Sequence, residues 1–380
     1  MKYRELGRTG IKVSEIGIGC VYFGEMHEAG LLEKVIHRGI DGGMNLLDIC
    51  LSELDIRDAV GKAIQGCRDK LIIQGHIGLT LENGQDARTQ DLGKSRAHIE
   101  DLLARLRTDH IDITMLHCID RIDEYKAAVE SGLIEYMLRQ KEKGVFRSLG
   151  FSSHEPDVAS AMIKDGHFDV VMFSVNPLFD LVFNDMDRFF SMPEDEAYPK
   201  DLDIDPRRAA FYGLCEEKGI GIVVMKALAA GSLVDPLDTP FAKAMTVPQC
   251  LRYALSRPAV AGVLLGYRNV EQVETALAYY TTPEPELDYS EILSSVTGEI
   301  SPKCLYCNHC LPCASSINIG EVTRLADSAS LGVSAELKSR YDRLGVKPSA
   351  CTKCGLCLPR CPFGIDVVAN MGKAKGLFEA

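Results

Sequence analysis

The chain has 380 residues, of which 46% are hydrophobic and 25% are charged, a balance typical of a globular protein. This composition excludes disordered, collagen-like and coiled-coil chains, and the length allows one large domain beside a smaller one. The net charge of −12 argues against nucleic acid as a partner. Apolar runs are shorter than the roughly 18–20 residues that span a membrane, and the charged start does not resemble a secretory signal, so we expect a cytoplasmic chain without a membrane span.

In chain order, the first twenty residues predict a β-hairpin with a turn at Gly7–Gly10. Beyond it, apolar segments of strand length alternate with segments of helical period. We expect eight strands, at Ile16–Gly19, Asn45–Ile49, Leu71–Gln74, Ile111–Leu116, Ser148–Phe151, Val170–Ser174, Ile220–Met225 and Val260–Leu265. This rhythm predicts an α/β protein whose residues 1–285 form a (β/α)8 TIM barrel.

Two further observations qualify this prediction. A doubly wound open sheet would have the same rhythm, but it needs a Gly-x-Gly-x-x-Gly turn, and the segment after Gly17 and Gly19 lacks the third glycine. The connection Leu178–Asp205 is long and rich in Asp and Glu. Because it follows a strand, it belongs to the catalytic face of a barrel, as a lid, as a docking surface or as a solvated excursion without function.

Cysteine is the strongest signal in the composition. Of 14 cysteines, six are single: Cys20, Cys50, Cys67, Cys118, Cys215 and Cys250. We interpret these as small buried apolar residues, setting Cys50 and Cys118 apart. The other eight form two runs near the C-terminus: Cys304, Cys307, Cys310 and Cys313, then Cys351, Cys354, Cys357 and Cys361. A chain without a secretory signal should hold such runs as metal ligands rather than disulfides.

The second run has spacers of two, two and three residues followed by Pro362, the bacterial ferredoxin pattern for a [4Fe–4S] cluster. Zinc is the alternative, but it would leave the third regularly spaced cysteine of each run redundant. In ferredoxins the fourth cysteine of a run binds the other cluster. We therefore expect two clusters, one held by Cys304, Cys307, Cys310 and Cys361, and the other by Cys351, Cys354, Cys357 and Cys313.

The C-terminal residues 286–380 are thus predicted to form a helical ferredoxin-like domain, with a helix at Ile319–Ala326 between the two runs. The first run departs from the usual form, because its last spacer has two residues and Ala314 replaces the proline. From Ser301 onward, ten Lys and Arg face six Asp and Glu, so this part is basic while the rest is acidic.

The barrel sequence resembles a known family. The resemblance covers residues 1 to about 280 and is carried by Tyr3-Arg-Glu-Leu-Gly-Arg-Thr-Gly, Gly43-Met-Asn-Leu-Leu-Asp48, the segment from Leu103 to His117, Gly144-Val-Phe-Arg-Ser-Leu-Gly-Phe-Ser152 and Met225-Lys-Ala-Leu. These motifs look like the aldo-keto reductase family, and the cysteine runs resemble its branch with a C-terminal two-cluster ferredoxin domain. The resemblance implies carbonyl reduction with NADPH through an Asp-Tyr-Lys-His tetrad.

Only part of that tetrad is present. Asp48 matches the aspartate and His117 the histidine, whereas Glu53 stands where the tyrosine belongs and His76 where the lysine belongs. The nicotinamide pocket is altered as well. Ser152, Ser153 and Arg268 remain where the family contacts the carboxamide and the 2′-phosphate, but three other contact positions carry Met172, Met225 and Ala276. We expect binding of NADP(H) or NAD(H) to be weakened or lost.

Asp48, Glu53, His76 and His117 should meet at the C-terminal mouth of the barrel, where two imidazoles and two carboxylates suit proton transfer. Alternatively Glu53 faces solvent, His76 and Asp48 form a structural pair, or the four residues bind a metal.

Three functions remain open. The first is an anaerobic iron–sulfur oxidoreductase that acts on a small carbonyl, hydroxyl or unsaturated substrate, with a redox partner of the ferredoxin or flavodoxin type. The second is a redox-neutral lyase or isomerase that uses Glu53, His76 and His117. The third is an electron-transfer or scaffold subunit without catalysis.

Overall fold

The computed structural model describes residues 1–183, 202–296, 303–329 and 332–379. The chain divides into two compact units, one of Met1–Leu79 with Thr89–Ile300 and one of Thr80–Arg88 with Ser301–Ala380. This division differs from the predicted one in two respects. The segment that follows residue 285 groups with the first unit, and a short segment from the middle of the barrel sequence groups with the cysteine-rich unit.

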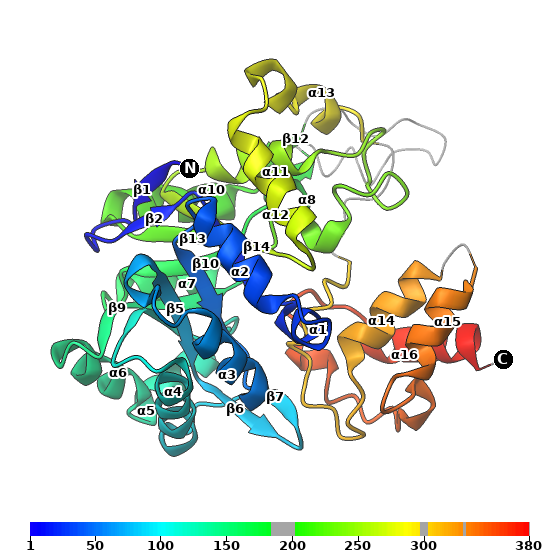
Figure 1. The fold of residues 1–380 in the computed structure, drawn as a ribbon, viewed down its shortest axis with the longest axis horizontal. Helices are drawn as coiled ribbons and strands as arrows, with labels where there is room; N and C mark the ends of the chain where they lie inside the picture. The colour runs from blue at the N-terminus through cyan, green and yellow to red at the C-terminus, as the bar shows by residue number, and fades with distance from the viewer. Residues whose placement is uncertain (184–201, 297–302, 330–331, 380) are drawn as a thin grey trace. The chain divides into compact units, whose positions relative to one another are not determined.

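The first unit contains a closed barrel of eight parallel strands, as the sequence predicts (Figure 1). In ring order the strands are β3 (Ile16–Gly19), β4 (Leu46–Ile49), β5 (Ile72–Ile77), β8 (Ile111–Leu116), β9 (Phe146–Ser153), β10 (Val170–Ser174), β13 (Gly221–Met225) and β14 (Val260–Gly266), and β14 pairs with β3 to close the ring. Strand β5 continues past the predicted end at Gln74, and this extension places His76 inside the strand.

Helices surround the barrel and bury their apolar faces against it. They are α1 (Phe23–Glu28), α2 (Leu32–Asp41), α3 (Leu54–Ala63), α4 (Leu92–Leu106), α5 (Ile122–Glu130), α6 (Leu133–Glu142), α7 (Pro156–Lys164), α8 (Pro177–Asp180), α10 (Pro206–Lys218), α11 (Val247–Leu255), α12 (Val270–Leu277) and α13 (Ser290–Leu293). The 3₁₀ helices are η1 (Arg68–Lys70), η2 (Ala229–Gly231), η3 (Ala278–Tyr280) and η4 (Glu284–Leu287).

The helix ends follow local sequence signals. Thr246 and Gln249 form a capping box at α11, and the Asp91 side chain caps α4. Gly61 permits the close approach of α3 to α4, because a Cβ there would lie 2.0 Å from the carbonyl oxygen of Arg105.

The predicted N-terminal hairpin is present and closes one end of the barrel. Strands β1 (Tyr3–Glu5) and β2 (Lys12–Ser14) are antiparallel. Leu6, Ile11 and Val13 are buried in the same interior cluster as Met172 and Met225. This cluster fills the barrel from its N-terminal end and leaves the C-terminal end for polar side chains.

The second unit is small and helical, apart from one hairpin. It contains β6 (Leu79–Glu82), β7 (Gln85–Arg88), α14 (Ile319–Ser328), α15 (Ala335–Asp342) and α16 (Val367–Phe378), with the 3₁₀ helices η5 (Pro348–Ala350) and η6 (Leu358–Arg360). Helix α14 packs along α16 (Figure 1). The apolar side chains of Ile317, Val322 and Met371 form its core together with the buried cysteine Cys310.

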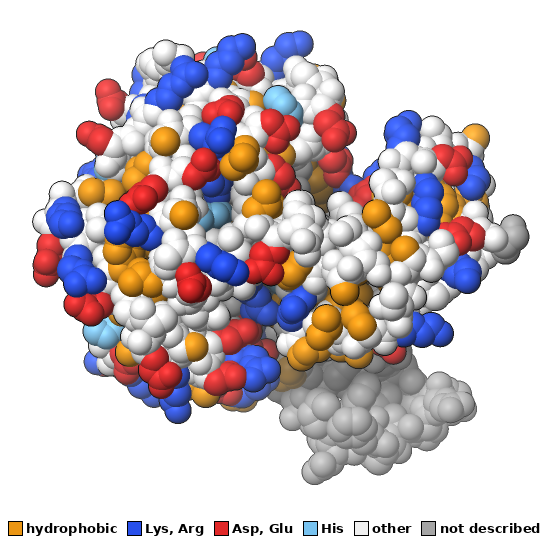
Figure 2. Space-filling model, turned by 90° about the horizontal axis from the view of Figure 1, so that it is seen from below, with side chains coloured by type: hydrophobic (Ala, Val, Ile, Leu, Met, Phe, Trp, Pro, Cys, Tyr) orange, Lys and Arg blue, Asp and Glu red, His pale blue; other side chains and the backbone are white. Residues whose placement is uncertain are grey.

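The acidic connection predicted at 178–205 is described only at its ends, where β11 (Leu181–Phe183) pairs with β12 (Leu202–Ile204). Most of its acidic residues, from Asp185 to Asp201, lie outside the described residues. Figure 2 shows acidic and basic side chains intermixed on one face of the barrel unit. Among the described residues, the structure contains no helix long and apolar enough to cross a membrane.

Candidate functional site

The C-terminal mouth of the barrel holds a chain of three buried titratable side chains. Asp48 lies near the end of β4 opposite Gln74 of β5, and the Gln74 Nε2 donates to Asp48 Oδ1 at 2.6 Å. His76 lies two residues further along β5, and its Nε2 is 3.0 Å from the same oxygen. His117 follows β8, and its Nδ1 is 2.8 Å from His76 Nδ1. The strand register thus brings Asp48, His76 and His117 into one hydrogen-bonded chain.

This chain can share protons between a carboxylate and two imidazoles. When His76 Nε2 donates to Asp48, the facing nitrogens of His76 and His117 hold one proton between them, so one imidazole is the donor and the other the acceptor. The side chains of Asp48 and His76 are nearly fully buried. The two imidazoles therefore use nitrogens on each other and on Asp48, rather than directing them at a common point where a metal would bind.

Glu53 is positioned by a helix rather than by a strand. It is the N-cap residue of α3, four residues beyond the end of β4, and it is half-buried. Buried Arg57 fixes this helix start, because its Nε donates to the carbonyl oxygen of Leu51 at 2.8 Å and its Nη1 donates to Asp101 at 2.7 Å. Glu53 therefore has a well-determined backbone position at the mouth of the barrel.

Two thiols lie beside Asp48. The Cys20 Sγ is 3.6 Å from Asp48 Oδ2 and 3.1 Å from the Cys50 Sγ. Each cysteine is the residue that follows a barrel strand, β3 for Cys20 and β4 for Cys50. The hydrogen bond from Cys50, the burial of Cys20 and the nearby Asp48 carboxylate together raise the pKa of the Cys20 thiol well above its ordinary value.

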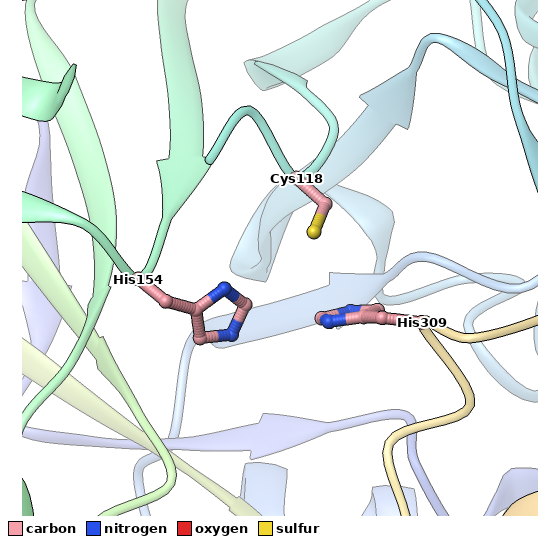
Figure 3. Close-up of side chains that lie close together, drawn as sticks. All are labelled: Cys118, His154 and His309. Atoms are coloured by element: carbon pink, nitrogen blue, oxygen red, sulfur yellow. The ribbon is translucent and has the colours of Figure 1, made fainter. Parts of the chain in front are cut away.

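The two serines expected to contact a nicotinamide are engaged within the protein. Ser152 Oγ accepts a hydrogen bond from the Cys118 backbone N–H at 2.7 Å, and Ser153 Oγ donates to Asp120 Oδ1 at 3.2 Å. Asp120 also binds the Nδ1 and the backbone N–H of buried His154, at 3.0 and 2.6 Å. Figure 3 shows the Cys118 thiol directed toward the space beside the His154 ring. These residues form a second polar cluster at the ends of β8 and β9.

Other positions of the expected nicotinamide pocket do not fit that cofactor well. Met172 and Met225 are buried in the barrel, and Met172 Sδ accepts a hydrogen bond from Gln74 Nε2. The Arg268 side chain, expected to bind a 2′-phosphate, forms an ion pair with Glu25 at 3.1 Å and stacks over the Tyr22 ring at 3.6 Å. The arginine therefore already has a carboxylate and an aromatic partner.

In the second unit the eight cysteines form two groups. Burial raises the pKa of Cys310, and the nearby thiols of Cys307, Cys304 and Cys361 raise it further. The pKa of Cys304 is raised to about 12, chiefly by burial and, less strongly, by Cys307 and Cys361. The four cysteines that were expected to bind one cluster therefore lie near one another.

The second group lines one pocket, whose walls include Cys313, Cys351, Cys354 and Cys357. Burial raises the pKa of Cys357, and the thiols of Cys354, Cys313 and Cys351 raise it further. Four thiols around an apolar pocket have the chemistry that a [4Fe–4S] cluster requires, so the cysteines present fit this group.

A side chain from the middle of the barrel sequence holds the second group. Gln85, on β7, accepts a hydrogen bond from the Cys313 backbone N–H at 2.9 Å and donates to the Ile317 carbonyl at 3.0 Å. The sequence analysis missed Gln85, because nothing in the local sequence separates it from other polar turn residues. It also missed Asp120 and the proximity of Cys20 to Cys50, although Cys50 was set apart as unusual.

The comparisons agree with this architecture. Residues 15–195 match the model of the Aldo/keto reductase family. The uncharacterized oxidoreductase YqkF of Bacillus subtilis is 27% identical over 72% of this chain and 89% of its own length. L-galactose dehydrogenase of Arabidopsis thaliana is 25% identical over 80% of this chain and 95% of its own length. The holo form of the aldo-keto reductase AKR11C1 from Bacillus halodurans, at 23% identity and a TM-score of 0.61, has the same fold over 78% of this chain and 97% of its own.

Proposed function

We propose that this chain, which contains an aldo/keto reductase family domain, is an iron–sulfur oxidoreductase whose barrel transforms a small carbonyl, hydroxyl or unsaturated substrate. Electrons would pass through two [4Fe–4S] clusters in the second unit, exchanged with a partner of the ferredoxin or flavodoxin type. The observation that carries the proposal is the grouping of eight cysteines into two sets of four.

The barrel supports the proton half of such a reaction. Reduction of a carbonyl to an alcohol takes up two electrons and two protons. When bound, each cluster supplies electrons one at a time. Asp48 orients His76, and His76 shares a proton with His117, so His117 can give up a proton and recover it through the chain. Glu53, half-buried at the same mouth, is a second acid or base.

We derive no step through a nicotinamide, because the residues present do not fit it. Arg268 is paired with Glu25, the hydroxyls of Ser152 and Ser153 are engaged at Cys118 and Asp120, and methionines fill the barrel interior. The expected electron source is therefore the second unit rather than a bound hydride donor.

A redox-neutral lyase or isomerase is the second candidate. It is favoured by the Asp48–His76–His117 chain, which can move protons without a redox group. The two candidates differ in one measurable property, since only the oxidoreductase couples substrate conversion to the oxidation state of the clusters.

The test is the metal content of protein purified without oxygen. We expect about eight iron and about eight sulfide per chain, as two clusters of four require. Cys354→Ala should remove about half of the iron, whereas Cys67→Ala, which changes a half-buried cysteine of the barrel unit, should remove none. Stoichiometric zinc in place of iron would contradict the proposal.

The same preparation distinguishes the two candidate functions. Chemically reduced protein is mixed with small carbonyl and unsaturated compounds, and reoxidation of the clusters is followed by absorbance. For a true substrate, His117→Ala and Glu53→Gln should slow reoxidation about 10²–10⁴-fold without loss of iron. Substrate turnover with no change in the clusters would favour the redox-neutral reaction.

A further inference from the structure

Two cysteines of the barrel face each other across neighbouring strands. Strands β3 and β4 are parallel and adjacent, with Ile18 opposite Leu47. Cys20 and Cys50 directly follow these strands, so both thiols lie at the C-terminal mouth. Their sulfur atoms are 3.1 Å apart, and the Cys50 backbone N–H donates to the Cys20 sulfur at 3.2 Å. Neighbouring strands also hold the two backbones at a separation that a disulfide can bridge.

The two thiols differ in exposure. Cys20 is only 1% exposed, whereas Cys50 is half-buried and reaches the mouth. By contrast, Cys215 and Cys250 lie in α10 and α11, buried among apolar side chains, and burial raises the pKa of Cys250 to about 12. An accessible thiol in front of a buried one is the arrangement in which the first attacks a substrate and the second resolves the product.

We propose that Cys20 and Cys50 form a redox-active dithiol that reduces small organic disulfides at the mouth of the barrel. The inference does not depend on the proposed function, because it needs only residues of the barrel unit.

The spacing of the sulfurs favours a dithiol over a metal site. Cys20, Cys50 and Asp48 offer three ligand atoms within 4.8 Å of one another, which would also suit a soft metal. Two thiolates bound to one tetrahedral zinc at about 2.3 Å lie about 3.8 Å apart. The observed 3.1 Å is shorter and lies on the way to the 2.0 Å of an S–S bond.

The reaction balances without a further reagent. The Cys50 sulfur attacks one sulfur of the substrate, RSSR, and the first RSH leaves with the proton of Cys50. The Cys20 sulfur then attacks the Cys50 sulfur of the mixed disulfide, and the second RS⁻ leaves. Asp48 Oδ2, 3.6 Å from the Cys20 sulfur, takes the Cys20 proton, which then reaches the leaving thiolate. In total, RSSR and two thiols give two RSH and the Cys20–Cys50 disulfide, so two electrons move from the protein to the substrate.

Asp48 as the proton acceptor links the dithiol to the histidine chain. The carboxylate contacts Cys20 through Oδ2 and His76 through Oδ1. Because the Cys20 thiol is buried with a raised pKa, its reaction needs such an adjacent base. Oxidation of the pair also removes the hydrogen that Cys20 directs at Asp48.

The experiment uses anaerobic, metal-loaded, fully reduced protein and 2,2′-dithiodipyridine as the disulfide. We expect a fast release of about two thiopyridone molecules and one new Cys20–Cys50 bond, located by peptide mass mapping after acid quench and alkylation. Dithiothreitol should restore the starting state. Cys20→Ser should release about one thiopyridone and keep a mixed disulfide on Cys50, and Cys50→Ser should lose the fast phase.

Cys67→Ser is the matched control, since Cys67 is also a half-buried cysteine of the barrel unit, and it should behave as the unaltered chain. The mapping of the unaltered chain does not require any variant to fold. The proposal is overturned if Cys20 and Cys50 stay unlinked after the disulfide is consumed, or if Cys20→Ser still releases two molecules in the fast phase. Stoichiometric zinc that blocks both thiols would overturn it as well.

Discussion

His98 is a buried imidazole held against a guanidinium. It lies on α4, and the Arg57 Nη2 of α3 is 2.6 Å from His98 Nε2. Burial lowers the pKa of His98 well below its ordinary value, and the charge of Arg57 lowers it further. The folded protein therefore keeps this imidazole neutral under conditions where an unfolded chain would protonate it.

This difference makes stability depend on pH. Between the lowered folded pKa and the unfolded value of about 6.5, the unfolded state binds more protons, so the free energy of unfolding falls as the pH falls through that window. The full stability is present above about 6.5. His98→Gln keeps an acceptor for Arg57 but does not titrate, so about 1 kcal/mol of the loss at pH 5.5 should disappear.

Urea unfolding between pH 5.5 and 8 measures this effect, with His167→Gln as a control at a histidine that is less buried. Equal acid sensitivity in His98→Gln and the unaltered chain would mean that His98 is not the titrating group.

Single residues were predictable where a local motif carries them. Asp48 and His117 were assigned from short stretches around strand ends, and the cysteine runs were assigned from their spacing alone. The contact between Cys20 and Cys50 was not predictable in this way. It depends on the register of two strands whose cysteines are thirty positions apart, and no local pattern encodes that register.

At the scale of elements, the hairpin of β6 and β7 joins the barrel sequence to the cysteine-rich unit. The chain leaves the barrel unit after Leu79 and returns at Thr89, whose backbone N–H donates to Gly78. Between these points Gln85 makes two hydrogen bonds to the backbone around Cys313. Strand positions were predicted from apolar periodicity, but this polar hairpin carries no such signal, so it was missed.

Gln85→Ala should loosen Cys313 by removing both hydrogen bonds, each worth about 1 kcal/mol. In the proposed iron-loaded protein, the cluster held by Cys313, Cys351, Cys354 and Cys357 should lose iron faster in air, and its electron paramagnetic resonance signal after reduction should change. Gln85→Glu keeps the acceptor for Cys313 and should have a smaller effect.

Gln140→Ala, on α6 of the barrel unit, is the matched control and should leave the iron content and both signals unchanged. If Gln85→Ala gives the same iron content, air stability and spectrum as this control, Gln85 does not position Cys313.

At the scale of the whole molecule, the fold was predictable and the use of its cofactor pocket was less so. Eight strand–helix units fix a barrel whatever fills its mouth, because the pattern reflects burial on both faces of each strand. The mouth depends on side chains that meet only after folding. Arg268 matched a phosphate-binding position by sequence, yet in the structure it is paired with Glu25 and stacked on Tyr22.

This pairing predicts weak nicotinamide binding and a way to improve it. Losses at three contact positions, each worth about 1 kcal/mol, should weaken binding of NADPH and NADH by roughly a hundredfold relative to a complete pocket. Glu25→Gln removes the charge that holds Arg268, so it should strengthen binding of NADPH by about 2–5-fold and leave NADH, which has no 2′-phosphate, unchanged. Calorimetric titration with both nucleotides measures this. A micromolar dissociation constant for NADPH in the unaltered chain would mean that the pocket is functional, and the barrel would then have its own hydride donor independent of the clusters.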